Sequence, residues 1–306
     1  MYAATSAIIL AMQTYLDCYP CFLRQSIEAA RMAGASQAQQ HQVVLQVLER
    51  LRKIPPGATP PEIGLEVHHL VREVTGNPDP YLKVKNEATQ RALEMLPKLR
   101  KIRDDSSDKL ETAIRLSIAG NIIDFGINKS FELWREVERV LDQELAINDI
   151  DLLREKLAQA EAILFLADNA GETVFDLILI EALSKPITYV TKGGPVLNDA
   201  TRKDAIAVGL DKAAEVIDNG LQAPGTILSL SPKDFQSQFK EAELILAKGM
   251  GNYETLSEVN APIFFLLQVK CPVIARDIGA EVGTTIVKKG LGISQPEHQL
   301  FGQNQI

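Results

Sequence analysis

The stretch Ala162–Asp176, with the sequence AILFLADNAGETVFD, constrains the fold of this 306-residue chain more than any other part. Its apolar run Ile163–Ala167 ends at Asp168 and Asn169, and apolar residues resume at helical spacing from Val174. A short apolar run before a helical pattern is typical of a buried parallel strand that turns tightly into a helix. The stretch therefore predicts a strand–turn–helix unit of an open α/β sheet, where ligands bind beyond the carboxyl ends of the strands.

The second half of the chain repeats this pattern. From Asp151 onward, short apolar runs alternate with helical or loop segments, which indicates βαβ units and a mostly parallel sheet. The predicted strands are Ile163–Ala167, Ile187–Val190, Glu215–Ile217, Leu244–Ala247 and Ile263–Leu267.

The first half has the apolar periodicity of helices, from about residue 14 to residue 145. Its later helices are expected at Tyr81–Arg103, at Lys109–Ile123 and at Phe131–Leu145, and Pro97 is expected to interrupt the first of these. We therefore expect a helical N-terminal domain over residues 1–148 and a Rossmann-like, three-layer α/β domain over residues 149–306.

Composition narrows the class of protein. The net charge of −8 argues against electrostatic capture of nucleic acid, which needs a basic surface. Three cysteines are too few for a disulfide framework, and no apolar run approaches the roughly 20 residues of a membrane span. The segment Met1–Met12 lacks the basic start of a signal peptide and is expected to be a weakly docked lead-in, as Gln295–Ile306 is expected to be a loose polar tail. These features predict a cytoplasmic protein.

Oxygen-bearing side chains follow two neighbouring predicted strands. Asp168 and Asn169 follow the first strand, and Asp199 lies in the segment KGGPVLNDAT after the second. Carboxylate and amide oxygens are the ligands that Mg²⁺ and Mn²⁺ prefer, and water and a substrate phosphate oxygen would complete the coordination. Asp168, Asn169 and Asp199 are therefore predicted metal ligands; the alternative is that they are helix N-caps.

Two lysines follow later predicted strands. Lys248 begins the segment KGMGNYET, whose glycines Gly249 and Gly251 offer backbone N–H groups to a phosphate, although the segment is neither a Walker A nor a GxGxxG motif. Lys270 follows the strand Ile263–Leu267 and would neutralise a phosphate as a point charge. The alternatives are an ordinary turn for the first segment and a solvated lysine for the second.

The ordered motifs LADNAGETVFD, TKGGPVLNDAT, AKGMGNYETLSE and VKCPVIA resemble those of the metal-dependent damage-control phosphatases. Some members of that family were once described as acidic-residue methyltransferases. The N-terminal motifs YLDCYPCFLRQ, DPYLKVKN and AIRLSIAGNIIDFG resemble its short, cysteine-bearing microbial branch, so the resemblance extends from about residue 14 to residue 291. It implies helices packed on a Rossmann-like domain, with a divalent ion (Mn²⁺, Mg²⁺, Co²⁺ or Ni²⁺) in the cleft between them.

The resemblance also assigns residues. It implies that Asp168, Asn169 and Asp199 hold the metal, and that Lys270 lies near the phosphate. Larger members carry Arg-Thr before this lysine, whereas this chain has Leu267-Gln268-Val269, which puts the arginine's phosphate contacts in doubt. The expected substrate-binding set is Asn121 and Asp124 (spaced GNxxD on one helix face), Glu172, Lys248, Gly251, Asn252, Tyr253 and Lys270.

The predicted function is metal-dependent hydrolysis of a small phosphorylated metabolite, such as a sugar phosphate or a damaged phosphometabolite. Asp168, Asp199 and Lys270 are the expected catalytic residues. Either Asp168 or a metal-activated water would attack phosphorus, and Asp199 and Glu172 are alternative general bases. Two other functions remain possible: an AdoMet-dependent carboxyl methyltransferase, which the DNAGE turn disfavours, and a non-catalytic phosphometabolite sensor.

Cys18 and Cys21 form a CxxC pair that opens a helix, not the strand-led setting of a thioredoxin motif. A structural zinc site needs four ligands, and Cys271 supplies only a third thiol. We expect reduced, partly buried cysteines; the alternative is a thiol–metal site that includes Cys18, Cys21 and Cys271.

Overall fold

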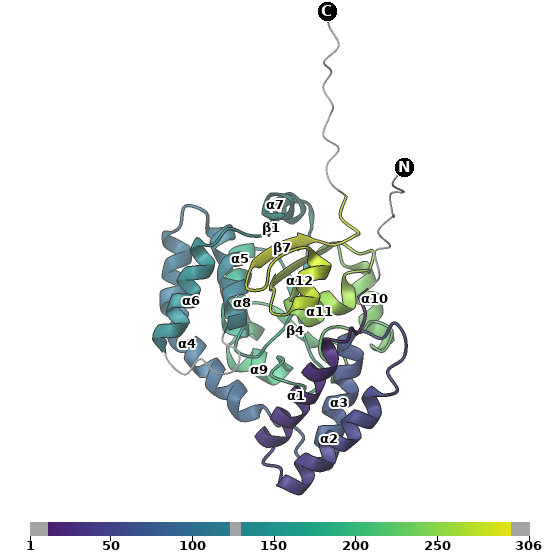
Figure 1. Cartoon of the computed structure of the whole chain (residues 1–306). Coiled ribbons are helices and arrows are strands. Elements are labelled where there is room, and N and C mark those ends of the chain that lie inside the picture. Colours follow the sequence, from purple (N-terminus) through teal and green to yellow (C-terminus); the bar gives the residue numbers. More distant parts are fainter. Residues whose placement is uncertain (1–11, 123–129, 295–306) are drawn as a thin grey trace, which may run out of the picture.

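Within the described residues, seven strands form one sheet in the order β1-β7-β6-β5-β2-β3-β4 (Figure 1). The computed structural model describes residues 12–122 and 130–294. Strands β6, β5, β2, β3 and β4 are parallel, β7 is antiparallel to β6, and β1 is parallel to β7. The strands are β1 (Ile147–Asn148), β2 (Ile163–Leu166), β3 (Ile187–Thr191), β4 (Glu215–Asp218), β5 (Ile245–Lys248), β6 (Ile263–Gln268) and β7 (Thr285–Lys289).

The predicted parallel α/β sheet is confirmed, with each of the five predicted strands in place. The sequence analysis missed β1 and β7. Strand β1 has only two residues, and β7 ends in Lys288 and Lys289, so neither has the continuous apolar run of a central strand. Both strands run against the direction of the central five, which the alternating βαβ pattern did not predict.

The strand order reverses next to β2. Strands β3 and β4 extend the sheet on one side of β2, and β5 and β6 extend it on the other. The switch point therefore lies between β2 and β5, and in open α/β sheets the crevice at this point is where ligands bind. The turn with Asp168 follows β2, and Lys248 ends β5, so both predicted polar segments lie at the switch point.

Helices cover both faces of the sheet (Figure 1). Those of the first half are α1 (Cys18–Met32), α2 (Gln37–Leu51), α3 (Pro60–Thr75), α4 (Leu82–Asp105), α5 (Lys109–Ala119) with the 3₁₀ turn η1 (Gly120–Ile122), and α6 (Ser130–Asp142). Those of the second half are α7 (Ile150–Gln159), α8 (Thr173–Leu183), α9 (Arg202–Ala207) with η2 (Leu210–Lys212), α10 (Lys233–Glu241), α11 (Gly249–Leu256) and α12 (Pro272–Ile278).

The helices of the first half divide between two hydrophobic cores. Residues of α4, α5 and α6 pack with α8 and with Phe165 on one face of the sheet. Residues of α1, α2 and α3 pack with α11 and α12 and with Leu164 and Leu166 on the other face. The alternation along β2 follows the two-residue period of a strand. The domain boundary between residues 148 and 149 stays a prediction, because both halves of the chain contribute to both cores.

The predicted interruption at Pro97 is wrong, since α4 continues through it. Pro97 is exposed, so water can reach the carbonyl that loses its helical partner. Ala92, Met95 and Leu99 are buried on the opposite side and hold the helix in place. None of the described helices is long and apolar enough to cross a membrane. The predicted polar tail lies outside the described residues, as does the predicted lead-in apart from Met12.

Candidate active site

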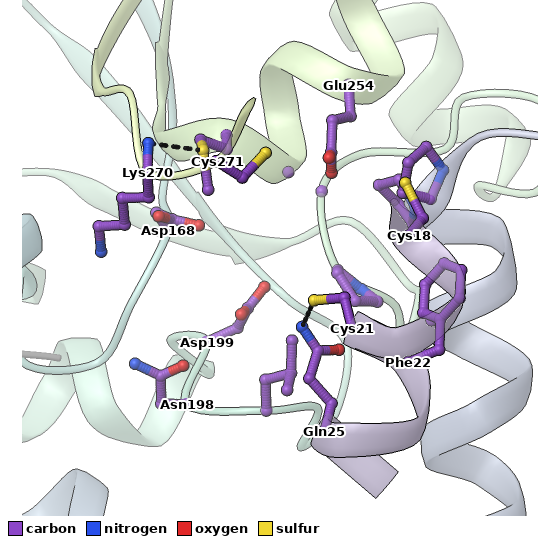
Figure 2. Close-up of a pocket in the computed structure, with 18 of the residues that line it drawn as sticks. Cys18, Cys21, Phe22, Gln25, Asp168, Asn198, Asp199, Glu254, Lys270 and Cys271 are labelled. Carbon is purple, nitrogen blue, oxygen red and sulfur yellow. Dashed lines mark hydrogen bonds between the residues drawn. The ribbon is translucent and has the colours of Figure 1, made fainter. Parts of the chain in front are cut away.

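A cavity of about 480 Å³ lies at the carboxyl ends of the parallel strands, between them and α1 (Figure 2). Its wall includes the turn after β2, the loop after β3, the start of α11 and the segment that begins at Lys270. The predicted site residues in this wall are Asn121, Asp168, Asn169, Asp199, Gly251 and Lys270. Among these predicted residues, Asn121 and Lys270 lie 149 positions apart in the sequence and are joined by a hydrogen bond.

Main-chain contacts join the two loops that carry the predicted metal ligands. Asn169 and Asp199 form an isolated antiparallel β-bridge. The backbone N–H of Ala200 donates to the carbonyl oxygen of Asp168 at 2.8 Å. Directly opposed residues in an antiparallel pair have Cβ atoms about 5 Å apart on the same face. The side chains of Asn169 and Asp199 thus start from neighbouring positions, with Asp168 next to them in the chain.

The helix-cap alternative for Asp168 and Asp199 is wrong. Helix α9 is capped by Thr201, which forms a capping box with Asp204. At the start of α8 the N-cap position belongs to Glu172, and no side chain makes a cap hydrogen bond there. The carboxylates of Asp168 and Asp199 instead line the cavity.

Two amides surround the carboxylate of Asp168. Asn169 Nδ2 donates to Asp168 Oδ2 at 3.1 Å and to Glu172 Oε1 at 2.6 Å. Asn121 Nδ2 donates to Asp168 Oδ2 at 2.9 Å and also to Glu172 Oε1. Because the nitrogen of the Asn169 amide faces two carboxylates, its orientation is fixed, and so is the side on which its oxygen lies.

A buried ion cluster lies behind these amides. Lys248 Nζ donates to Glu172 Oε2 at 2.9 Å, to Asp176 Oδ1 at 2.7 Å and to the carbonyl oxygen of Ser117 at 2.9 Å. Burial raises the pKa of Asp176 despite the opposing charge of Lys248. Burial alone would lower the pKa of the Lys248 ammonium. The negative charges of Asp176 and Glu172 have the larger combined effect, so its pKa is raised. Glu172 therefore accepts hydrogen bonds from Lys248 and from the amides of Asn121 and Asn169.

Gly249, directly after β5, lies so close to the Asp168 carboxylate that no side chain fits between them. It has a φ of +77°, in the left-handed region that favours glycine. A Cβ atom built on it would lie 1.9 Å from Asp168 Oδ2, well inside van der Waals contact. The first glycine of the KGMGN segment is thus needed for the position of a predicted metal ligand.

Lys192, which the sequence analysis did not select, lies beside the predicted metal ligand Asp199. Its Nζ donates to the carbonyl oxygen of Ala167 at 3.0 Å and lies 3.7 Å from Asp199 Oδ2. The signal that would have found it is a charged residue after the apolar strand β3, beside the glycine pair of the KGGP segment.

Lys270, which was predicted to lie near the phosphate, lines the cavity. Its Nζ donates to the main-chain oxygen of Asn121 at 2.6 Å, which ties the segment after β6 to η1. This contact holds a positive charge on the same side of the cavity as Asp168.

Other residues predicted to bind substrate do not line the cavity. Lys248 and Glu172 lie in the buried cluster. Asn252 is buried, accepts a hydrogen bond from Thr226 Oγ1 at 2.8 Å and donates to main-chain carbonyls. Tyr253 donates to Asp277 Oδ2 at 2.8 Å, and burial raises the pKa of its hydroxyl. The remaining predicted contact, Asp124, lies outside the described residues.

The cavity wall also carries thiols. Cys18, Cys21 and Cys271 line it and are free. Burial raises the pKa of Cys18 to about 11 and also raises the pKa of Cys271. In the described part of the chain, no three side chains of His, Cys, Asp or Glu are grouped to hold a metal ion. The thiol–metal alternative therefore has no support in the structure, and the predicted metal centre relies on two carboxylates and an amide oxygen.

The sheet, with carboxylates at its switch point, defines an α/β protein with a cavity at its strand ends. The family model for the damage-control phosphatase ARMT1-like domain matches residues 14–286, and the chain belongs to this family. The predicted family is thus confirmed.

Relatives from archaea cover most of the chain. A damage-control phosphatase of Pyrococcus horikoshii is 36% identical over 90% of this chain and 97% of its own length. A damage-control phosphatase of Archaeoglobus fulgidus is 37% identical over 74% of this chain and 81% of its own. A crystal structure of a DUF89 family protein from Pyrococcus horikoshii matches with a TM-score of 0.83 and 32% identity, covering 91% of this chain and 99% of that one.

Proposed function

We propose that the protein is a metal-dependent phosphatase that hydrolyses small phosphomonoesters, such as sugar phosphates or damaged phosphometabolites. The observation that carries the proposal is the pairing of the Asn169 and Asp199 backbones beside Asp168 at the wall of one cavity. Membership of the damage-control phosphatase family supports the same reaction.

The residues present fit a hard divalent ion. Asp168, Asn169 and Asp199 offer only oxygen donors, which suits Mg²⁺ or Mn²⁺, and the resemblance adds Co²⁺ and Ni²⁺. When bound, the ion would supply positive charge to the phosphate oxygens. The space that Gly249 leaves beside Asp168 Oδ2 supports this arrangement, since a side chain there would displace the carboxylate.

In the proposed reaction, the oxygen of a nucleophile forms a bond to phosphorus while the bond from phosphorus to the ester oxygen breaks. The departing ester oxygen takes a proton, and overall one water is consumed for each phosphate released. Asp168 is the candidate nucleophile, or it orients the attacking water. Asp199 is the favoured general base over Glu172, because Asp199 lines the cavity whereas Glu172 is bonded to Lys248. Lys270 stabilises negative charge on the phosphoryl group.

We assign supporting roles to the buried residues of the predicted substrate set. Glu172 and Lys248 hold the amides of Asn121 and Asn169 in place. Asn252 and Tyr253 tie α11 to its neighbours through Thr226 and Asp277. Substrate contacts on this side of the cavity then come from the main chain near Gly251, which lines it.

The test is a screen of phosphomonoesters against a matrix of Mn²⁺, Mg²⁺, Co²⁺ and Ni²⁺. We expect phosphate release that depends on the metal and falls at least about 100-fold in Asp168→Ala. Asp218→Ala is the matched control, because Asp218 also ends a parallel strand but does not line the cavity. Unchanged activity in Asp168→Ala would reject the role of Asp168. Tight AdoMet binding without metal would favour the methyltransferase, and binding without turnover across the screen would favour a sensor.

A further inference from the structure

Glu254 points into the cavity from the second turn of α11, on the side away from Asp168 (Figure 2). It makes no hydrogen bond or ion pair with any described residue. Its charge influences the pKa values of Cys18 and Cys271, so these two thiols are its neighbours. A carboxyl group without a protein partner in a cavity wall is a candidate contact for a ligand.

Burial raises the pKa of Glu254 to about 8, with no contribution from a neighbouring charge. The other charged side chains of the cavity wall are Asp17, Arg24, Glu28, Asp168, Asp199 and Lys270. Burial in the cavity wall thus favours the protonated form of the Glu254 carboxyl. In that form it both donates and accepts hydrogen bonds, as a hydroxyl group does.

Helix α11 sets the spacing between this carboxyl and the predicted metal ligands. Gly249, the first residue of the helix, contacts Asp168, and Glu254 follows five residues later. With a rise of 1.5 Å per residue, the two positions are about 7.5 Å apart along the helix axis. A short-chain ligand with its phosphate at Asp168 would thus place its other end near Glu254.

We propose that Glu254 binds a hydroxyl group on the leaving group of the substrate, with the amide of Gln25 on α1 as a second polar contact, and so selects polyol phosphates. Gln25 also lines the cavity, where its Nε2 donates to Cys21 Sγ at 3.4 Å (Figure 2). This inference rests on the proposed phosphatase function. An ammonium group is the less suitable partner, because it would require the carboxyl to ionise in a buried setting beside two protonated thiols.

The test compares three esters with the same five-carbon chain: ribitol 5-phosphate, pentyl phosphate and 5-aminopentyl phosphate. The full-length protein with its activating metal should have a kcat/KM at least about tenfold higher for ribitol 5-phosphate than for pentyl phosphate. Glu254→Leu should reduce this ratio about tenfold, mainly through ribitol 5-phosphate. Glu254→Gln should keep the ratio within about threefold, because an amide also donates and accepts. Glu258→Leu is the matched control, since Glu258 is exposed just beyond α11.

Equal kcat/KM for ribitol and pentyl phosphates in the unaltered protein would overturn the inference without any variant. An unchanged ratio in Glu254→Leu would do the same. A preference for 5-aminopentyl phosphate that both variants lose would show that the carboxylate binds ammonium instead. If none of the three esters is hydrolysed with any metal, the proposed function fails separately. Calorimetric binding of ribitol 5-phosphate and pentyl phosphate to the protein and to Glu254→Leu then still decides the role of Glu254.

Discussion

Gly249 and Asp168 lie so close that the space between them admits no side chain: a Cβ atom on Gly249 would lie 1.9 Å from Asp168 Oδ2. Asp168 lies just after β2, and Gly249 lies directly after β5. These two strands are neighbours at the switch point of the sheet. The position of the Asp168 carboxylate thus depends on the absence of one carbon atom from the adjacent strand end.

Gly249→Ala should therefore lower metal-dependent activity by about 100-fold or more, as expected when a reacting group is displaced by an ångström. Gly279→Ala is the control, because Gly279 has the same φ of +77° but nothing within 4 Å of its added Cβ. Both variants should lose about 1–2 kcal/mol of stability from the left-handed backbone. Phosphate release and chemical denaturation measure the two effects. Equal activities in the two variants would show that Asp168 tolerates the intrusion.

Lys248→Met should destabilise the protein by about 3–5 kcal/mol, because it leaves two buried carboxylates without their cation. The partners are Glu172 and Asp176, and both are fully buried. Urea denaturation measures the loss, with Lys240→Met on the exposed end of α10 as the control. Adding Asp176→Asn to Lys248→Met should restore part of the stability, since it removes one of the unpaired charges. A double variant no more stable than Lys248→Met would contradict the charge argument.

Lys85→Met should also be destabilising by about 3–5 kcal/mol. Buried Lys85 on α4 lies 3.0 Å from Asp79 Oδ2 and 3.2 Å from Asp204 Oδ2, and Asp204 belongs to the helix that follows the Asp199 loop. Lys83→Met is a close control, because exposed Lys83 is paired only loosely, at 4.0 Å from Glu87. Thermal and urea unfolding distinguish the variants, and similar losses for both would argue against the buried pair.

His68 should make the protein sensitive to acid. Burial, followed by the charge of Arg72, lowers the pKa of His68 to about 3 in the folded protein, and its Nε2 has no partner among the described residues. As the pH falls from about 6.5 towards 3, the unfolded chain binds a proton that the folded protein does not, so stability falls by up to about 1.4 kcal/mol per pH unit.

His68→Leu should remove this part of the pH dependence. Urea denaturation at pH 7.5, 6 and 5 should show the difference between His68→Leu and the unaltered protein moving in favour of the variant as the pH falls. His69→Leu, at the exposed neighbouring position, serves as the control. Parallel stability curves for the unaltered protein and His68→Leu would refute the assignment.

The sequence predicted the sheet and one wall of the cavity because both follow from local patterns. Apolar runs identified the central strands, and the polar residues at their ends were bound to meet at one edge of a parallel sheet. Asp168, Asn169 and Asp199 were found in this way.

The sequence did not distinguish the two strand-end lysines. Lys248 and Lys270 both follow predicted apolar strands, yet Lys248 pairs with the buried carboxylates of Glu172 and Asp176 while Lys270 lines the cavity. The difference depends on how α8 packs against β5, which is a tertiary relationship. Glu254 was missed for a similar reason: nothing in its neighbourhood along the chain shows that the start of α1, more than 200 residues away, closes over it.

The division of the first-half helices between the two faces of the sheet has a consequence for truncated forms of the protein. Ser117 on α5 accepts from Lys248, while α1 supplies the opposite wall of the cavity. A fragment that begins at residue 149 would therefore lose cover on both sides of its sheet together with half of its binding pocket. The proposed catalysis therefore requires both halves of the chain, and truncations near the midpoint should be inactive even where they remain soluble.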